Sequence, residues 1–484
     1  MSFLKTSQKR AQSANAAACE LRASMQGSIV LPSDAAYANT RAVWNGAVDH
    51  QPALIALCKT AEDVQRAIRA ARAHRLPLSV RCGGHDWTGR ALCHEGLVID
   101  LSEMRHVEVE PPARVATVAG GALAGDLITA ATPHGLVAVT GAAGTIGMAG
   151  MTLGGGYGPL TPQYGLAVDN LLGADVVLAD GQIVTADALS NNDLWWALRG
   201  GGGNFGVVVS MRIRLHPIKG LLTGLILFPW SEAGSVLQGY ADAVASAPDE
   251  LSVIVGVLPG PDADPFLVLA PTWTGDPAKG EDVLTELQCL GSPILVTIGP
   301  TIPDDTFGIF GTHAAKGCHY AVRTRWLSKL TPDAISALVS AGTNRTSPFS
   351  AIVLHHFHGA PCRVPLGETA FGLRREHFLV IAVAAWELGL EDNGAIHRQW
   401  ARTLSRTLVP SSLPGGYPSL LGPNDHDQIA SAYGSNIGRL MALKRRFDPD
   451  GLFTSTIPLP GDPRELPPRS YRIGSNAESV ASLV

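Results

Sequence analysis

The chain has 484 residues, of which 37 are basic and 42 acidic, giving a formal net charge of −5. Scattered basic residues lack the concentrated positive charge that nucleic-acid binding requires, so we expect no nucleic-acid partner. A hydrophobic content of 46% excludes long disordered tracts, and no run of about 18 apolar residues predicts a membrane span. The length exceeds what one hydrophobic core usually serves, which favours two domains, or one with a large insertion, and a small-molecule ligand.

Cysteine usage and the N-terminus predict the compartment. Seven cysteines, from Cys19 to Cys362, show no CxxC spacing, which argues against a disulfide framework and a zinc site. The first 25 residues carry no apolar core of a signal peptide. We therefore expect a cytoplasmic protein, with a short, loosely docked helix from Ala14 to Met25.

The first regular region predicts a strand, a helix and two further strands. The strand "PALIALCK" precedes "TAEDVQRAIRAARAHRL", which has apolar residues at helical spacing after a capping threonine. The strands "PLSVRCGG" and "GLVIDLSEM" follow. This arrangement places His85 on a loop directly after a strand that ends in two glycines.

The next region, residues 113–215, is rich in glycine. The segment "ARVATVAGGALAGDLITAATPHGL" predicts a strand, a turn and a helix, and "LLGADVVLADGQIVTA" predicts a hairpin that turns at Asp180-Gly181. The segment "NNDLWWALRGGGGNFGVVVSMRIRL" predicts a helix, a glycine loop and a strand. Glycines this dense indicate backbone that approaches other backbone or a ligand closely.

The central region, from about residue 219 to 414, has a different sequence pattern. Longer helices alternate there with apolar strands such as "SVIVGVL" and "HFLVIAVAAW", which predicts an antiparallel sheet backed by helices. The tail contains a helix that ends at Asp448-Pro449.

Gly201, Gly203 and Gly206 form a GxGxxG pattern, but a helix precedes it and a strand follows, the reverse of the Rossmann order. This context argues against a nicotinamide-dependent dehydrogenase. Taken together, the glycine clusters at 83–84, 120–121, 141–158 and 200–206 favour the walls of a ligand channel, whose backbone N–H groups suit a pyrophosphate. Taken singly, each is explained by a tight turn.

Four motifs in order identify a family. The segments "VRCGGHDWTG", "GTIGMAGMTLGGGYGPLTPQYGLAVDN", "DLWWALRGGGGNFGVV" and "RLMALKRRFDPDGLF" resemble the FAD-linked oxidases of the vanillyl-alcohol oxidase superfamily, and more closely its berberine-bridge-enzyme-like group. The resemblance covers about the first 215 and the last 60 residues. It implies an α+β fold with a two-part, PCMH-type FAD-binding domain, residues 1–217 and 416–484, and an inserted substrate-binding domain of antiparallel sheet plus helices, residues 218–415.

The resemblance also implies how FAD is held. His85 matches the histidine that bonds covalently to the 8α-methyl of the flavin, and Ala143 replaces a cysteine that gives many relatives a second bond, so a single attachment is implied. Ile146 matches a position that controls oxygen access and is usually valine in good oxidases. We expect Cys82 to serve packing. The other matching cofactor positions are Arg81, Gly83, Gly84, Thr145, Gly147, Gly150, Gly154, Gly155, Gly156, Asn170, Val207 and Asn436.

Four side chains are candidates for catalysis. Tyr157 and Tyr433 match positions that point into the active site of relatives, although each could simply pack with its hydroxyl satisfied. On the strand "VLHHFHGA", His356 and His358 share one face, and we expect them to supply a base near neutral pH. The alternatives are a packing pair or a metal site, for which no third ligand has suitable spacing.

These observations predict an FAD-dependent oxidoreductase that oxidises a small molecule at a C–H next to O or N. The substrate classes are a phenolic or benzylic alcohol, an amine or alkaloid, or a biosynthetic intermediate, with O2 as electron acceptor and H2O2 as product. The alternatives are a dehydrogenase that uses another acceptor, a sugar oxidase, and a flavin-binding carrier or sensor without turnover.

Overall fold

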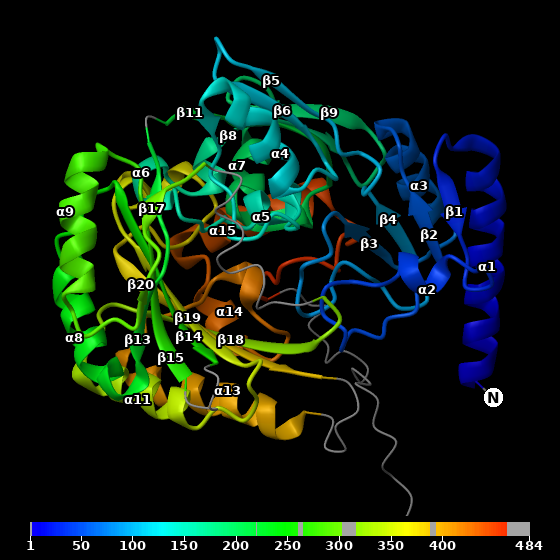
Figure 1. Ribbon diagram of the computed structural model, residues 1–484. Helices are drawn as coiled ribbons and strands as arrows, with labels where there is room; N and C mark the ends of the chain where they lie inside the picture. The colour runs from blue at the N-terminus through cyan, green and yellow to red at the C-terminus, as the bar shows by residue number, and fades with distance from the viewer. Residues whose placement is uncertain (1, 219, 260–264, 303–315, 388–393, 462–484) are drawn as a thin grey trace, which may run out of the picture.

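The chain folds into two small sheets with their helices, followed by one large sheet covered by helices, and then returns to the first part (Figure 1). The computed structural model describes residues 2–218, 220–259, 265–302, 316–387 and 394–461, with side chains from residue 10 onward. No helix in these ranges is long and apolar enough to cross a membrane.

The first sheet has the strand order β1-β2-β4-β3, and β4 runs parallel to both β2 and β3. Its strands and the helix α3 cover the following residues: β1 Ser28–Val30, β2 Leu54–Leu57, β3 Leu78–Arg81, β4 Leu97–Asp100 and α3 Ala61–Ala73. The N–H of Asp63 donates to the hydroxyl of Thr60, which caps α3. The predicted strand, helix and two strands are confirmed.

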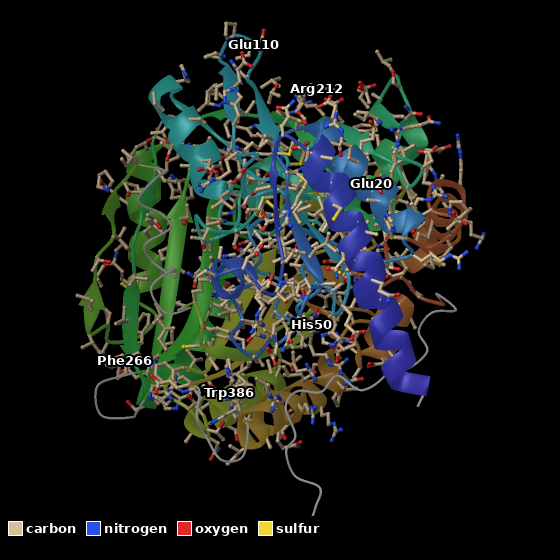
Figure 2. All side chains as sticks on the ribbon, turned by 90° about the vertical axis from the view of Figure 1, so that its right-hand side faces the viewer. Glu20, His50, Glu110, Arg212, Phe266 and Trp386 are labelled. Carbon is tan, nitrogen blue, oxygen red and sulfur yellow. The ribbon has the colours of Figure 1, made fainter. Side chains whose placement is uncertain are left out.

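Helix α1, Ser2–Ser24, lies along the outside of this sheet's helix α3, as Figure 2 shows with Glu20 labelled. Ala17, Ala18 and Leu21 are fully buried against the core that includes α3. The prediction of a short, loosely docked helix was therefore wrong, because small alanine side chains let α1 approach closely without large apolar residues.

The second sheet is antiparallel, with the order β5-β6-β10-β8-β9. Its strands are β5 Val107–Glu110, β6 Val115–Ala119, β8 Leu171–Val177, β9 Ile183–Asp187 and β10 Val207–Arg214. The helices packed with it are α4 Ala124–Ala131, α5 Met148–Leu153 and α7 Asn192–Gly201. β7, Leu136–Val137, and β11, His216–Pro217, pair separately. The β8–β9 hairpin turns at Gly181 with φ +84°, which confirms the predicted turn.

The large sheet is antiparallel, with the order β16-β13-β15-β14-β19-β20-β18, and β12 and β17 extend it beside β15. Its strands are β12 Leu222–Thr223, β13 Ile226–Pro229, β14 Leu251–Pro259, β15 Pro265–Trp273, β16 Leu295–Val296, β17 Gly299–Pro300, β18 His319–Leu327, β19 Ala351–Phe357 and β20 His377–Trp386. The helices on its outer face are α8 Ala233–Val244, α9 Pro277–Gln288, α11 Pro332–Thr343 and α13 Ala395–Thr407 (Figure 1). The predicted antiparallel sheet backed by helices is confirmed.

Alternation along the strands divides the large sheet into two faces. Val253 and Val255 of β14 join the apolar core formed with α8, α11 and α13. The intervening residues face the other way, toward the first part of the chain, where Phe357 and Leu379 form a second core with Tyr417. A ligand bound by the first part can therefore be covered by this inner face.

The tail returns to the first two sheets through α14, His426–Ser431, and α15, Ile437–Phe447. Leu440 of α15 joins the core of the second sheet, and Ser455 forms a bridge with Ser79 of β3. Helix α15 ends where Asp448 accepts a hydrogen bond from Lys444, as the sequence predicts for this position. The domain limits at 217 and 415 remain predictions.

Short helical segments connect the main elements. They are α2 Tyr37–Thr40, α6 Thr161–Tyr164, α12 Ala360–Arg363, η1 Thr132–His134, η2 Ala167–Asn170, η3 Gly202–Asn204, η4 Trp230–Glu232, η6 Leu366–Glu368, η7 Val409–Ser411, η8 Pro418–Leu420 and η9 Gly434–Asn436.

A buried ion pair ties the large sheet to the first part. Arg374, just before β20, donates two hydrogen bonds of 2.7 and 2.8 Å to the carboxylate of Asp169, and both side chains are more than nine-tenths buried. A third hydrogen bond, of 2.6 Å, joins Arg374 to the hydroxyl of Thr369. Such a bidentate pair fixes orientation as well as distance.

We expect Asp169→Asn to lower the free energy of unfolding by about 3–5 kcal/mol, because it leaves the Arg374 guanidinium buried without a counter-charge. The matched control is Asp193→Asn, since Asp193 pairs with Arg439 at 2.9 Å on the surface. The control should cost less than about 1 kcal/mol. Chemical denaturation of both variants checks this, and equal costs would contradict it.

Candidate functional site

Two glycine loops meet backbone to backbone at the edge of the first sheet. Gly83 follows β3 and Gly147 precedes α5, and a Cβ built on Gly83 would lie 2.5 Å from the backbone nitrogen of Gly147. A Cβ on Gly147 would lie 2.4 Å from the sulfur of Cys82. Only glycine permits this approach, so the contact sets the position of both loops.

Cys82 packs beneath this contact. Burial raises the pKa of its thiol to about 12, so it is not a thiolate at neutral pH. Its S–H lies 3.6 Å from the carbonyl oxygen of Ala122. The structure thus supports the predicted packing role.

His85 lies on the exposed side of the two loops. Its Nε2 is 2.8 Å from the hydroxyl of Thr145, and its ring stacks on Trp44 at a centroid distance of 5.7 Å. Burial, and secondly the charge of Lys316, lower the pKa of His85 to about 4, so the imidazole is neutral at pH 7. A neutral imidazole keeps one nitrogen lone pair available for bonding to a ligand.

The surface beside His85 has room for a ligand. Thr145 and Gly150 are exposed, and a Cβ built on Gly150 would meet nothing within 4 Å. Ala143 and Ile146 are half-buried in the same loop, and Ala143 offers no nucleophile. This glycine cradle, defined by Gly83, His85, Thr145, Gly147 and Gly150, therefore fits a flat, phosphate-bearing cofactor such as FAD.

Arg81 is engaged elsewhere. Its guanidinium donates to the carbonyl of Thr40 and lies 3.5 Å from the carboxylate of Asp100. Gly84, with φ +69°, carries the chain past this side chain. Arg81 thus braces the loop, its Nε has no hydrogen-bond partner among the described residues, and its role in binding the cofactor stays a prediction.

The second glycine run brings Tyr157 to the inner face of the large sheet. Gly155 has φ +130° and packs against the rings of Phe371 and Tyr417, and the N–H of Gly156 donates to the Tyr417 hydroxyl at 2.9 Å. Gly154 packs against Ser419. Larger residues would separate the loop from the C-terminal segment.

Tyr157 forms a hydrogen-bonded pair with His377. The carbonyl of Arg375 accepts from Nδ1 of His377 at 2.7 Å, so Nδ1 carries the proton and Nε2 accepts from the Tyr157 hydroxyl at 3.0 Å. Burial lowers the pKa of His377 to about 3. Burial, and secondly Tyr417, hold the pKa of Tyr157 well above its usual value, so Tyr157 is a hydrogen-bond donor at neutral pH.

Strand β19 turns His355 and Phe357, and not His356 and His358, toward Tyr157. Tyr157 contacts His355 and Phe357 at ring-centroid distances of 6.3 and 5.3 Å. His356 and His358 stack on each other at 4.3 Å on the outer face, where His356 also stacks on Phe378. His356 and His358, which we expected to supply a base, thus lie on the face that points away from Tyr157, and they share one face as predicted.

His356 and His358 have structural partners on that outer face. Nε2 of His356 donates to Glu376 at 3.0 Å, and the two ring nitrogens of His358 lie 3.4 Å from the carbonyl oxygens of His356 and Pro248. This matches the alternative of a packing pair. No group of three His, Cys, Asp or Glu side chains suited to a metal ion occurs in the described ranges.

Four other predicted residues lie in cores. Tyr433 is 1% exposed and its hydroxyl donates to the Pro458 carbonyl at 3.0 Å, so the packing alternative holds. The Asn170 amide bonds to Tyr164, Leu166 and His216, and the Asn436 amide bonds to Leu366 and Thr369. Val207 begins β10 inside a core. Each of these side chains is already occupied by contacts within the protein.

Sequence reasoning missed His355, His377 and Tyr417. His355 lies next to His356 on the strand and so points to the opposite face, but nothing in the strand pattern distinguishes the inner from the outer face when both carry histidine. His377 begins an apolar strand and Tyr417 lies in a proline-glycine loop, so neither belongs to a motif. The signal that could have found His377 is its period-2 register with Leu379 and Ile381.

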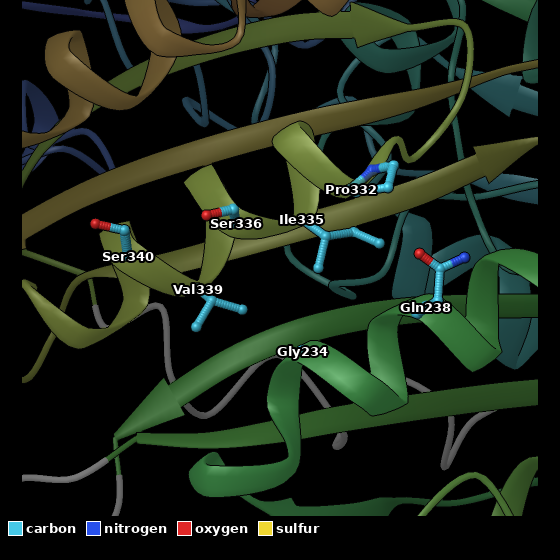
Figure 3. Close-up of a pocket in the computed structure, with 7 residues that line it drawn as sticks. All are labelled: Gly234, Gln238, Pro332, Ile335, Ser336, Val339 and Ser340. Carbon is cyan, nitrogen blue, oxygen red and sulfur yellow. The ribbon is translucent and has the colours of Figure 1, made fainter.

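Grooves on the outer face lie away from this cluster. Figure 3 shows one of about 470 Å³ between α8 and α11, lined by Gly234, Gln238, Ile335 and Val339 among others. Another, of about 810 Å³, lies between α11 and α13. Both are separated from His355 by the large sheet.

Comparison with known families defines the class of protein. Residues 52–187 match the family described as FAD binding domain, and residues 424–460 match the family described as berberine and berberine like. These ranges contain the glycine cradle and the returning tail. The chain belongs to the berberine-bridge-enzyme-like family of FAD-linked oxidoreductases.

Individual relatives extend the similarity over nearly the whole chain. (R)-6-hydroxynicotine oxidase of Paenarthrobacter nicotinovorans is 30% identical over 451 residues, which cover 89% of this chain and 96% of the relative. An FAD-linked oxidoreductase of Gibberella zeae is 31% identical over 428 residues, covering 86% of this chain and 82% of that one. The crystal structure of 6-hydroxy-D-nicotine oxidase from Arthrobacter nicotinovorans has a TM-score of 0.83 and 28% identity, and covers 90% of this chain and 98% of that chain.

The xylooligosaccharide oxidase of Myceliophthora thermophila, solved with xylobiose, has a TM-score of 0.80 at 23% identity, covering 93% of this chain and 100% of that chain, and shares the fold. The protein is an FAD-dependent oxidoreductase with the predicted α+β, PCMH-type fold. The FAD-binding family takes the place of the nicotinamide-dependent dehydrogenase that the sequence context argued against.

We expect Gly147→Ala to lower both the melting temperature and the FAD content, because its Cβ would overlap the Cys82 sulfur and force the two loops apart. Overpacking of this kind costs about 1–3 kcal/mol. Thermal denaturation and the ratio of flavin to protein absorbance measure the two effects.

Two further alanine variants locate the effect. Gly234→Ala in α8, whose Cβ would meet nothing within 4 Å, is the control and should leave FAD content unchanged. Gly150→Ala should preserve the melting temperature of the FAD-free protein yet reduce FAD content, since its Cβ enters the cradle. Unchanged FAD content in both Gly147→Ala and Gly150→Ala would contradict the position of the cradle.

Proposed function

We propose that this protein oxidises a small molecule at a C–H next to O or N, using FAD bonded to His85, and that O2 accepts the electrons and yields H2O2. One observation carries the proposal. The glycine cradle, which includes His85, is adjoined by the inner face of the large sheet, where Tyr157, His355 and His377 come together. The cytoplasmic location and the limits of the substrate-binding domain, 218–415, remain part of the proposal.

His85 is suited to a covalent bond because its imidazole is neutral and its ring is held by Thr145 and Trp44. The bond joins a ring nitrogen to the 8α-methyl carbon of the flavin. One hydrogen leaves each partner, and O2 removes both with two electrons as H2O2. Since Ala143 has no nucleophile, the attachment is single.

When bound, FAD supplies the two-electron acceptor for the substrate C–H bond. His355 is the candidate base, since it is half-buried beside Tyr157 and no described group hydrogen-bonds to its ring. Burial lowers the pKa of His355 to about 4, which keeps the imidazole neutral. Tyr157, held by its hydrogen bond to His377, forms a wall of the substrate site beside His355 and so orients the substrate.

Two finer alternatives concern the electron acceptor and the substrate. Ile146 is bulkier than the valine expected of good oxidases, and this favours a dehydrogenase with another acceptor if it blocks O2. A sugar oxidase is the second alternative. The apolar and aromatic inner face, with Phe357 and Leu379 beside His355, argues against a polar sugar.

The proposal is tested by the visible spectrum and intact mass of the denatured protein. We expect yellow colour that stays with the acid-precipitated protein and a mass increase equal to one bound FAD. His85→Ala should abolish the mass increase, whereas His94→Ala, which changes an exposed histidine, should retain it. Colour released entirely into the supernatant of the unmodified protein would refute the histidyl bond.

The pH dependence of the reductive half-reaction tests the role of His355. The neutral imidazole is the active form, and its lowered pKa keeps it neutral down to about pH 4. Anaerobic flavin reduction should therefore stay constant between pH 6 and 8 and fall only as pH decreases through about 4. A midpoint between pH 6 and 7, where an ordinary imidazole titrates, would contradict this role.

A further inference from the structure

Residues 44–46 connect the loop that carries His85 to the large sheet. The N–H of Trp44 donates to the carbonyl of Gly84, the residue before His85, at 3.1 Å. The carbonyl of Trp44 accepts from the N–H of Gly317 at 3.0 Å, just before the edge strand β18. The backbone of Trp44 is therefore hydrogen-bonded both to the His85 loop and to the large sheet.

Two glycines set the distance between residues 44–46 and β18. The N–H of Gly46 donates to the Cys318 carbonyl at 2.9 Å, and a Cβ built on Gly46 would lie 2.1 Å from the carbonyl oxygen of Gly317. Gly317 itself has φ +96°, a conformation that side chains disfavour. Glycine is therefore required at one position by a close contact and at the other by the backbone conformation.

The carboxamide of Asn45 holds this contact together from inside. Its Oδ1 accepts from the N–H of Tyr320 at 2.9 Å and from the N–H of Ala47 at 3.0 Å. Its Nδ2 donates to the carbonyls of Trp87 at 2.6 Å and Tyr320 at 3.0 Å. Asn45 is only 3% exposed, so water does not compete for these bonds. We call this unit the Asn45 clamp, made of Trp44, Asn45, Gly46, Gly317, Cys318 and Tyr320.

The clamp brings the ring of Trp44 against two other rings. Trp44 stacks on Tyr320 at a centroid distance of 3.8 Å and an interplanar angle of 14°, and on His85 at 5.7 Å and 18°. Nε2 of His85 also lies 2.8 Å from the hydroxyl of Thr145. The plane of the imidazole is therefore fixed by two contacts, and one of them depends on a strand of the large sheet.

We propose that Trp44 and Asn45 are positioning residues for the covalent attachment of FAD, and that they link this step to the docking of β18. This inference rests on the proposed function, because it concerns how the bond to His85 forms. The imidazole nitrogen can bond to the 8α-methyl carbon only when the ring is held at the right distance and angle. The bond replaces one hydrogen on each partner, and O2 removes both hydrogens, with two electrons, as H2O2.

The clamp acts on the orientation of His85 and not on the glycine cradle as a whole. The contact between Gly83 and Gly147, and the Cys82 side chain packed beneath it, include none of the clamp residues. A weakened clamp should therefore leave the cradle able to hold FAD, while the imidazole samples orientations from which it does not react. The expected result is flavin that is bound but not attached.

The test measures bound and attached flavin separately. The full-length chain is synthesised in vitro with FAD present; the absorbance ratio of flavin to protein gives the bound flavin, and intact mass after acid precipitation gives the attached flavin. Asn45→Asp replaces two donated hydrogen bonds with contacts between oxygens, and Trp44→Leu removes the ring. Each should lower the rate of attachment per bound flavin at least about tenfold. Asn45→Asp preserves side-chain volume, so it decides the test should Trp44→Leu fail to fold.

Two further variants separate positioning from stability. Trp44→Phe keeps a ring against the imidazole and should attach flavin within about twofold of the unmodified rate. Trp400→Leu truncates a tryptophan of α13 that is 7% exposed and belongs to the outer core of the large sheet. It should lower the melting temperature, yet leave the rate of attachment per bound flavin unchanged.

Failure of the inference and failure of the proposed function give different results. If Asn45→Asp attaches flavin at the unmodified rate, or Trp400→Leu slows attachment equally, the clamp does not position His85, while the histidyl bond stands. Loss of bound and attached flavin at a constant ratio would make the clamp part of the cradle and would also overturn the inference. Unmodified protein that releases all its colour on acid precipitation overturns the proposed function itself, and the inference with it.

Discussion

The contact between Gly83 and Gly147 is the constraint on which the site depends. It joins the first sheet to the helix-bearing second sheet at a distance that no Cβ permits. Because His85 lies two residues beyond Gly83 and Thr145 two residues before Gly147, the same contact sets the hydrogen bond between them. The requirement for glycine at this backbone contact thus determines the position of the His85 imidazole.

Successive side chains on a strand of the large sheet point to opposite faces, and this decides which of them reach the site. Successive histidines on β19 enter two environments: His355 faces the aromatic cluster beside the cradle, and His356 faces helices and Glu376. The cluster is then completed by residues far apart in the chain, Tyr157, His377 and Tyr417. The site is therefore assembled by three segments that come together only in the folded protein.

Sequence alone predicts those helix ends and turns that depend on neighbouring residues in the chain. Thr60 before α3, Gly181 in the hairpin and Asp448 after α15 each act through neighbouring backbone, and all three appear as predicted. The packing depth of α1 was not predictable, because it depends on the complementary surface of α3. The choice between His355 and His356 likewise depends on which face the helices cover, a property of the whole sheet.

The path of the chain has a consequence for synthesis. The strand β3 beside the cradle is made early, yet its bridge partner Ser455 and the Lys444–Asp448 pair belong to the last described residues. Domains generally fold as units while the ribosome is still at work, but here the first unit lacks its closing segment until the inserted sheet has been translated. A polypeptide that ends within the large sheet contains every residue of the glycine cradle but lacks Ser455 and the Lys444–Asp448 pair, so its first two sheets are left without the segment that closes them.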